Sequence, residues 1–101
     1  MLLTKLEKTI ILNLKGRISK ILNVPSKIKK EEKAHLETVF HAIDNLLLSV
    51  EKDIEATKAS FQELLEEIIP SLEKSSKRYI KEHIVPLMNK ISKNEWGRIN
   101  E

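Results

Sequence analysis

The sequence has no cysteine, two glycines and three prolines among its 101 residues. Without cysteine the chain forms no disulfide and offers no thiolate ligand to a metal, which suits a reducing compartment. The longest runs of large aliphatic residues, 10–12 and 46–48, are only three residues long. Neither a membrane span nor the hydrophobic segment of a signal peptide is therefore expected, and we predict a cytoplasmic protein.

What is present is typical of a globular helical protein. Hydrophobic residues make up 41% of the chain and charged residues 33%, which is enough apolar surface for one core. We predict one all-α domain over residues 1–101. The few helix-breaking residues divide it into expected helices at about 4–22, 27–69, 71–85 and 86–99.

The first expected helix, 4–22, begins with a capping box. Thr4 and Glu7 have the spacing at which each side chain accepts a hydrogen bond from the other residue's backbone N–H. Apolar residues then recur every three or four positions and indicate one buried stripe. The pair Val24-Pro25 ends the pattern, because a residue before proline is displaced from helical geometry.

The segment 27–69 contains neither glycine nor proline and carries a long heptad pattern, interrupted only by Thr57. Such a pattern keeps one stripe facing a partner helix, so we call it the seam. We expect one continuous helix here, although Ser60 and Glu63 form a second capping signature where the chain has an alternative place to turn. The large apolar residues of the seam are Leu36, Phe40, Ile43, Leu47, Val50, Ile54, Phe61, Leu64 and Ile68.

Proline shapes the last third of the chain. Pro70 is expected to end the long helix, and Pro86 is expected to kink or split the next one, because proline lacks the N–H that would bond four residues back. Ser92 and Glu95 form a third capping signature, from which we predict a short final helix.

The seam also leads to an expectation about assembly. The flanking helices are each too short to cover a helix of about 40 residues, which would be roughly 60 Å long. The predicted fold is therefore a bundle of three to four helices around one long central heptad-patterned helix, assembled as a homodimer through the seam. A monomeric three-helix bundle is the alternative.

Charge is distributed in three blocks. Residues 1–30 have a net charge of +7, residues 31–69 of −7 and residues 70–101 of +3. This order suggests an acidic central helix between two basic ones, with part of the positive charge neutralised inside the molecule. The first block nevertheless offers a strip of cations that could contact phosphates of double-stranded RNA. These residues are Lys5, Lys8, Lys15, Arg17, Lys20, Lys27, Lys29 and Lys30.

One short motif is associated with catalysis in other proteins. Arg78 and His83 are separated by four residues, and this arrangement resembles the Arg-x-x-x-x-His signature of HEPN-type ribonucleases, which are dimeric helical bundles. The resemblance covers six residues. It implies metal-free RNA cleavage, with His83 as general acid and base and Arg78 on the phosphate.

A metal site is not expected. Glu32 and His35 have the spacing used by carboxylate-bridged di-iron bundles, but such a site needs a second copy of the motif. Neither His41 nor His83 has a glutamate three positions earlier. We therefore predict no metal and no cofactor.

The sequence as a whole favours a non-enzymatic module that binds a macromolecule. No nucleophile–base pair and no glycine-rich phosphate loop is found. A protein partner is the leading hypothesis, double-stranded RNA the alternative, and RNA cleavage the third.

Overall fold

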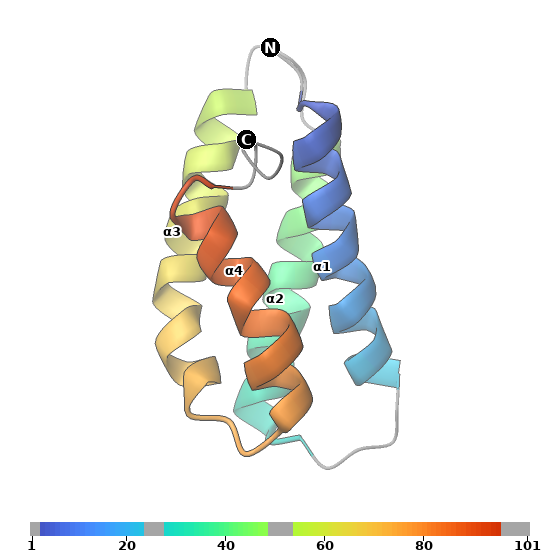
Figure 1. Cartoon of the computed structure of the whole chain (residues 1–101), viewed down its shortest axis with the longest axis vertical. Coiled ribbons are helices and arrows are strands. Elements are labelled where there is room, and N and C mark those ends of the chain that lie inside the picture. Colours follow the sequence, from blue (N-terminus) through green and yellow to red (C-terminus); the bar gives the residue numbers. More distant parts are fainter. Residues whose placement is uncertain (1–2, 24–27, 49–53, 96–101) are drawn as a thin grey trace.

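The computed structural model describes residues 3–23, 28–48 and 54–95. In this part of the chain, four α-helices run alternately up and down the long axis (Figure 1). A π-helical turn leads into the last of them. The elements are α1 (Lys5–Asn23), α2 (Lys30–Leu47), α3 (Ile54–Glu73), η2 (Ile80–Ile84) and α4 (Val85–Ser92). The expected all-α class is confirmed for these residues.

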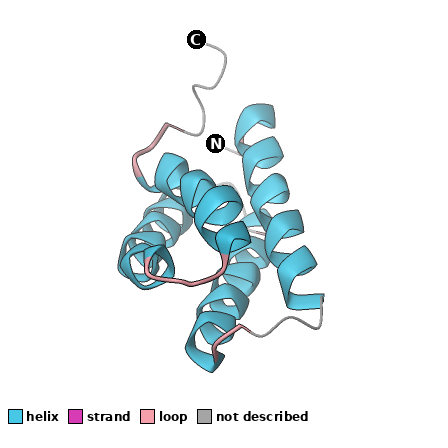
Figure 2. Ribbon diagram, turned by 60° about the horizontal axis from the view of Figure 1, so that its bottom comes forward, coloured by secondary structure: helices cyan, strands magenta, loops and turns pink. Residues whose placement is uncertain are grey.

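The helices form a ring around one core. α1 packs on α2, α2 on α3, and α3 on α4, while η2 and α4 return to α1 and close the ring. The loops that are described lie at the ends of the helices (Figure 2). Each helix therefore has two neighbours and one face toward solvent, as in an antiparallel four-helix bundle.

The expected continuous helix over 27–69 is wrong. α2 ends at Leu47, Leu48 is a turn residue with φ −92° and ψ −2°, and α3 begins at Ile54 and packs back against α2. The heptad pattern misled because a stripe repeating every three and four residues only requires that each helix bury one side. Two antiparallel helices on a shared core meet that requirement as well as one long helix does.

The seam residues consequently lie inside a single chain. Those that are buried are Leu36, Ile43, Ile54, Phe61 and Ile68. Phe40, Leu47 and Leu64 are half-buried and pack against the same core, and Val50 lies outside the described residues. The argument for a dimer rested on a long seam left in water, and in the folded chain the described part of the seam is covered.

The start of α1 follows the sequence closely. The Thr4 backbone N–H donates to Glu7 Oε1 at 2.9 Å, and the Glu7 N–H donates to Thr4 Oγ1 at 3.1 Å. The predicted capping box is thus confirmed, and it satisfies two backbone donors that the first turn would otherwise leave unpaired.

The two helical prolines act differently. α3 continues through Pro70 to Glu73, contrary to expectation; Pro70 is exposed, where water can satisfy the carbonyl left without its donor. Pro86 does disrupt its helix. Because it has no N–H for the carbonyl of Glu82, the chain widens into η2, where the Val85 N–H donates to the Ile80 carbonyl, and α4 then begins with proline near its N-terminus.

The chain after α4 also differs from expectation. α4 ends at Ser92, and Asn94 has φ 60°, a left-handed conformation that terminates helices. Ser92 and Glu95 therefore do not open a final helix. The remainder of the expected helix 86–99, from residue 96 onward, lies outside the described residues.

Gly16 offers a direct test of α1. It is exposed in the middle of the helix, and a methyl group at its Cβ position would meet no atom within 4 Å. We expect Gly16→Ala to raise the free energy of unfolding by about 1 kcal/mol, measured by urea denaturation, because alanine loses less backbone entropy in a helix. Ala34→Gly, at an exposed site in α2, should lower it by a similar amount. A destabilised Gly16→Ala variant would show that α1 is not a regular helix at this point.

Candidate charged interface

Opposite charges occupy opposite halves of the bundle. α1 has five basic residues and one acid, and residues 77–95 have five basic residues and two acids. Together these two segments have a net charge of +7. α2 has two basic residues and four acids, and α3 has one basic residue and five acids. Together these two helices have a net charge of −6. Because η2 and α4 pack on α1 while α2 packs on α3, we call α1 with residues 77–95 the basic half and α2 with α3 the acidic half (Figure 1).

Few of these charges are neutralised within the described part of the chain. Lys15 Nζ lies 2.6 Å from Asp44 Oδ1, across the boundary between α1 and α2. Arg78 Nε lies 3.1 Å from Glu82 Oε2, within the basic half. Exposed pairs of this kind contribute little to stability. The exposed glutamates of α3 are Glu55, Glu63, Glu66, Glu67 and Glu73.

A cluster of contacts joins the two elements of the basic half. Arg17 Nη1 donates a hydrogen bond of 2.6 Å to the backbone carbonyl of His83 in η2. Lys20 Nζ lies over the Tyr79 ring, 5.7 Å from its centroid, and the Tyr79 and His83 rings are 5.0 Å apart. These contacts hold residues 79–83 against α1.

The structure distributes the eight cations predicted for nucleic-acid contact over several sites. Lys5, Lys8 and Lys20 are exposed on α1, and Arg17 is half-buried against η2. Lys15 is engaged with Asp44 and also lies 5.1 Å from the Phe40 ring centroid. The other three are not on α1: Lys29 and Lys30 stand at the start of α2, and Lys27 lies outside the described residues.

Sequence reasoning missed the contribution of the C-terminal helix to this surface. Lys77, Lys81 and Lys90 belong to the basic half because η2 and α4 lie beside α1. The net charge of +3 in residues 70–101 was the available signal. That charge was expected to lie against the acidic central helix, because with a single long helix expected, nothing indicated that the first and last segments would be neighbours.

Arg78 and His83 belong to two different side-chain pairs. The Arg78 side chain is 85% exposed and is held by Glu82, whereas the His83 ring lies against Tyr79. The Glu82 carboxylate beside the guanidinium competes with a phosphate for the same donor. The Arg-x-x-x-x-His hypothesis therefore receives no support from a shared pocket.

Among the described residues, no three histidine, aspartate or glutamate side chains come together as a metal-binding group. The Glu32 carboxylate is instead buried at the start of α2, where it accepts a hydrogen bond of 3.1 Å from the Lys29 backbone N–H. Glu32 therefore caps the N-terminus of α2, as the glutamate of a capping box does.

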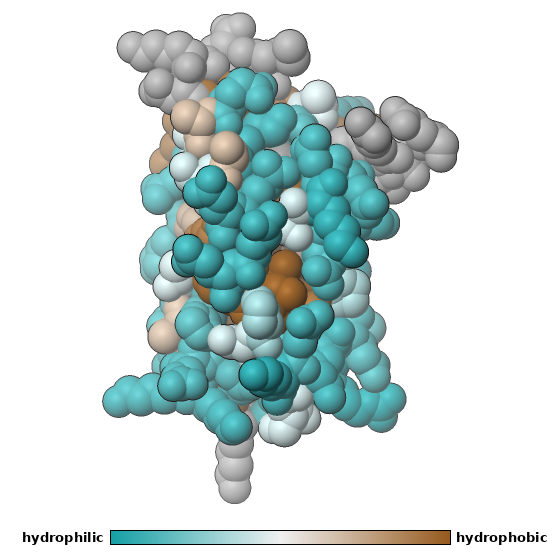
Figure 3. Space-filling view, turned by 90° about the vertical axis from the view of Figure 1, so that its left-hand side faces the viewer, coloured by the Kyte–Doolittle hydropathy of each residue, from teal (hydrophilic) through white to brown (hydrophobic). Residues whose placement is uncertain are grey.

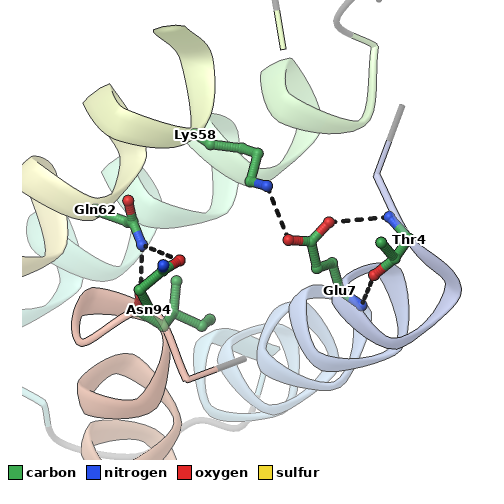
Figure 4. A network of polar contacts seen from close by, with 6 residues as sticks. Thr4, Glu7, Lys58, Gln62 and Asn94 are labelled. Carbon is green, nitrogen blue, oxygen red and sulfur yellow. Dashed lines mark hydrogen bonds and ion pairs between the residues drawn. The ribbon is translucent and has the colours of Figure 1, made fainter. Parts of the chain in front are cut away.

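A second polar cluster lies at the opposite end of α1, between the starts of α1 and α3 (Figure 4). Lys58 Nζ donates to Glu7 Oε2 at 2.8 Å, and the two side chains are 18% and 9% exposed. Burial raises the pKa of the Glu7 carboxyl, but the Lys58 ammonium and the hydrogen bonds from Thr4 together outweigh it and hold the pKa below its ordinary value. This pair is more shielded from solvent than the Lys15–Asp44 and Arg78–Glu82 pairs.

Beside this pair, a groove of about 600 Å³ separates α3 from the end of α4. Gln62 crosses it, donating to the Ile91 carbonyl at 2.9 Å and to Asn94 Oδ1 at 3.3 Å (Figure 4). Glu63 and Glu66 are on its α3 side. The groove is polar and open, and its contacts tie the end of α4 to α3.

Apolar side chains contribute little to the described surface. Among the described residues, the large hydrophobic residues that are exposed are Leu12 on α1 and Leu48 just after α2, at 50% and 81%. The side of the molecule presented by α3 is mostly hydrophilic, with a small hydrophobic area in a hollow (Figure 3). None of the described helices combines the length and apolarity that a membrane crossing requires.

Comparisons with known proteins returned no match: no family model fits the chain, and neither the curated proteins nor the solved structures include a significant relative.

Proposed function

We propose that this protein is a non-enzymatic binding module that holds an acidic macromolecule on its basic half. The observation that supports the proposal is the separation of charge, +7 on α1 with residues 77–95 against −6 on α2 with α3. Gathering cations on one side costs self-repulsion that a partner of opposite sign relieves. The cytoplasm, the location expected from the sequence, contains many such partners.

This proposal changes the expected surface while keeping the expected class of function. A homodimer through the seam would need the apolar stripe of α2 and α3, and that stripe contributes to the core of one chain. The surface that stays available is charged. An encounter through it would be steered electrostatically and would weaken as salt rises.

A matched pair of double variants tests the proposal. Lys20→Gln/Lys81→Gln removes two cations from the basic half, and Lys30→Gln/Lys33→Gln removes two from the acidic half, so both variants have the same net charge. On a heparin column, used as a polyanion probe, we expect the first variant to elute at clearly lower salt than the second, because only the first weakens the contact surface. Elution of the two variants at the same salt would show that net charge alone governs binding and would contradict the proposal.

A further inference from the structure

We infer that the partner of the basic half is a nucleic-acid duplex, gripped by its phosphate backbone without reading its sequence. The inference rests on the proposed function and names the class of its partner. Three observations carry it: the type of basic residue, the state of the aromatic residues nearby, and the dimensions of the basic half.

The basic half is rich in lysine and poor in the residues that anchor protein partners. Its exposed cations include Lys5, Lys8, Lys20, Lys81 and Lys90. Lysine is depleted at the cores of protein–protein interfaces, where aromatic residues and arginine are enriched. Lysine does bind phosphate as a point charge, and phosphate contacts position a protein on a duplex and carry no sequence information. An acidic protein surface is thus the weaker fit.

The aromatic side chain on this surface is already engaged. Proteins that hold single strands stack exposed aromatic rings on successive bases. The Tyr79 ring is half-buried, with the Lys20 ammonium 5.7 Å from its centroid and the His83 ring at 5.0 Å. Phe40 is half-buried on α2, beneath Lys15. Without an open ring to stack on, the described surface favours a partner whose bases are already stacked in a duplex.

The dimensions of the basic half agree with a short duplex site. α1 has 19 residues, which at 1.5 Å per residue makes it about 28 Å long. A duplex rises 3.4 Å per base pair, so α1 spans about eight base pairs. Arg17 and Lys20 contact residues 79–83, so cations of α1 lie beside those of η2 at this end of the bundle. The acidic half faces the other way and would be repelled from the same duplex, which fixes the side that binds.

The test is a fluorescence anisotropy titration with labelled duplexes of about 16 base pairs, twice the span of α1. RNA and DNA duplexes of two unrelated sequences, and the matching single strands, are the probes. We expect duplex binding that is insensitive to sequence, with Kd raised about tenfold in Lys20→Gln/Lys81→Gln and little changed in Lys30→Gln/Lys33→Gln. The slope of log Kd against log salt should fall by about one for each contacting lysine removed.

Three results would overturn the inference. Single strands bound as tightly as duplexes would show that strand pairing is not recognised. Displacement of the duplex by poly-glutamate at equal charge would point to an acidic protein instead. If no duplex binds at low salt while the heparin elutions still differ between the two variants, the duplex is wrong and the proposed function stands; if the elutions also coincide, both fail.

Discussion

Replacing Ile43 by aspartate is expected to unfold the bundle. Ile43 is completely buried on α2. The substitution loses about 2 kcal/mol or more of apolar burial and places a carboxylate in the hydrophobic core, at a cost of several kcal/mol more. Because a domain of this size is stable by about 5–15 kcal/mol, the loss should be visible as a collapse of the far-UV circular dichroism signal at 25 °C.

Leu12→Asp is the matched control, because it introduces the same charge on an exposed face of α1. We expect it to retain the wild-type spectrum and to change the free energy of unfolding by less than about 1 kcal/mol. Ile43→Ala keeps the test quantitative if the aspartate variant cannot be purified. It should fold and lose about 2–5 kcal/mol.

Ile43→Ala also separates a single-chain core from an intermolecular seam. If Ile43 packs within its own chain, the urea midpoint will not depend on protein concentration. A midpoint that rises with concentration in the wild type would mean that folding is coupled to association between copies, and loss of that rise in Ile43→Ala would place Ile43 in the contact between them.

Helix type and local capping were accessible from the sequence because they depend on near neighbours. Thr4 and Glu7 are three residues apart, so their reciprocal hydrogen bonds follow from spacing alone. The disruption of the helix before Pro86 follows from a missing donor in the same way. The widening of the helix into a π-turn depends in addition on η2 having a surface to pack on, and α1 supplies it.

The end of α2 and the start of α3 could not be predicted from near neighbours in the sequence. The segment between these helices has no glycine or proline to mark it, and the apolar spacing continues through it. Whether the stripe of α2 faces α3 or a second chain is decided by packing between residues far apart in the sequence. The basic half was hidden for the same reason: Lys20 and Tyr79 are neighbours only because the chain reverses direction three times. Residue types could be read from the sequence, but their grouping on one surface could not.

The ion pair between Glu7 and Lys58 should make the stability of the bundle depend on pH. Folding lowers the pKa of Glu7, because Lys58 and Thr4 favour the ionised carboxylate more than burial opposes it. A carboxyl with a lowered pKa contributes stability that is complete above its unfolded pKa, about 4.3, and is lost as pH falls through the folded value. The contribution of this pair is therefore present at neutral pH and disappears in acid.

Glu7→Gln isolates this contribution, since glutamine retains the size of the side chain and can still complete the capping box. We expect it to lower the free energy of unfolding by about 2 kcal/mol at pH 7, because Lys58 is 18% exposed and loses its counter-ion. As the pH falls through the lowered pKa of Glu7, the difference from wild type should shrink toward zero, because both chains then lack the charge. Glu82→Gln removes a carboxylate from the exposed pair with Arg78 and should cost less than about 0.5 kcal/mol at neutral or acid pH. Urea titrations across this range test the prediction: parallel stability curves for wild type and Glu7→Gln would mean that the Lys58 contact contributes no charge-dependent stability.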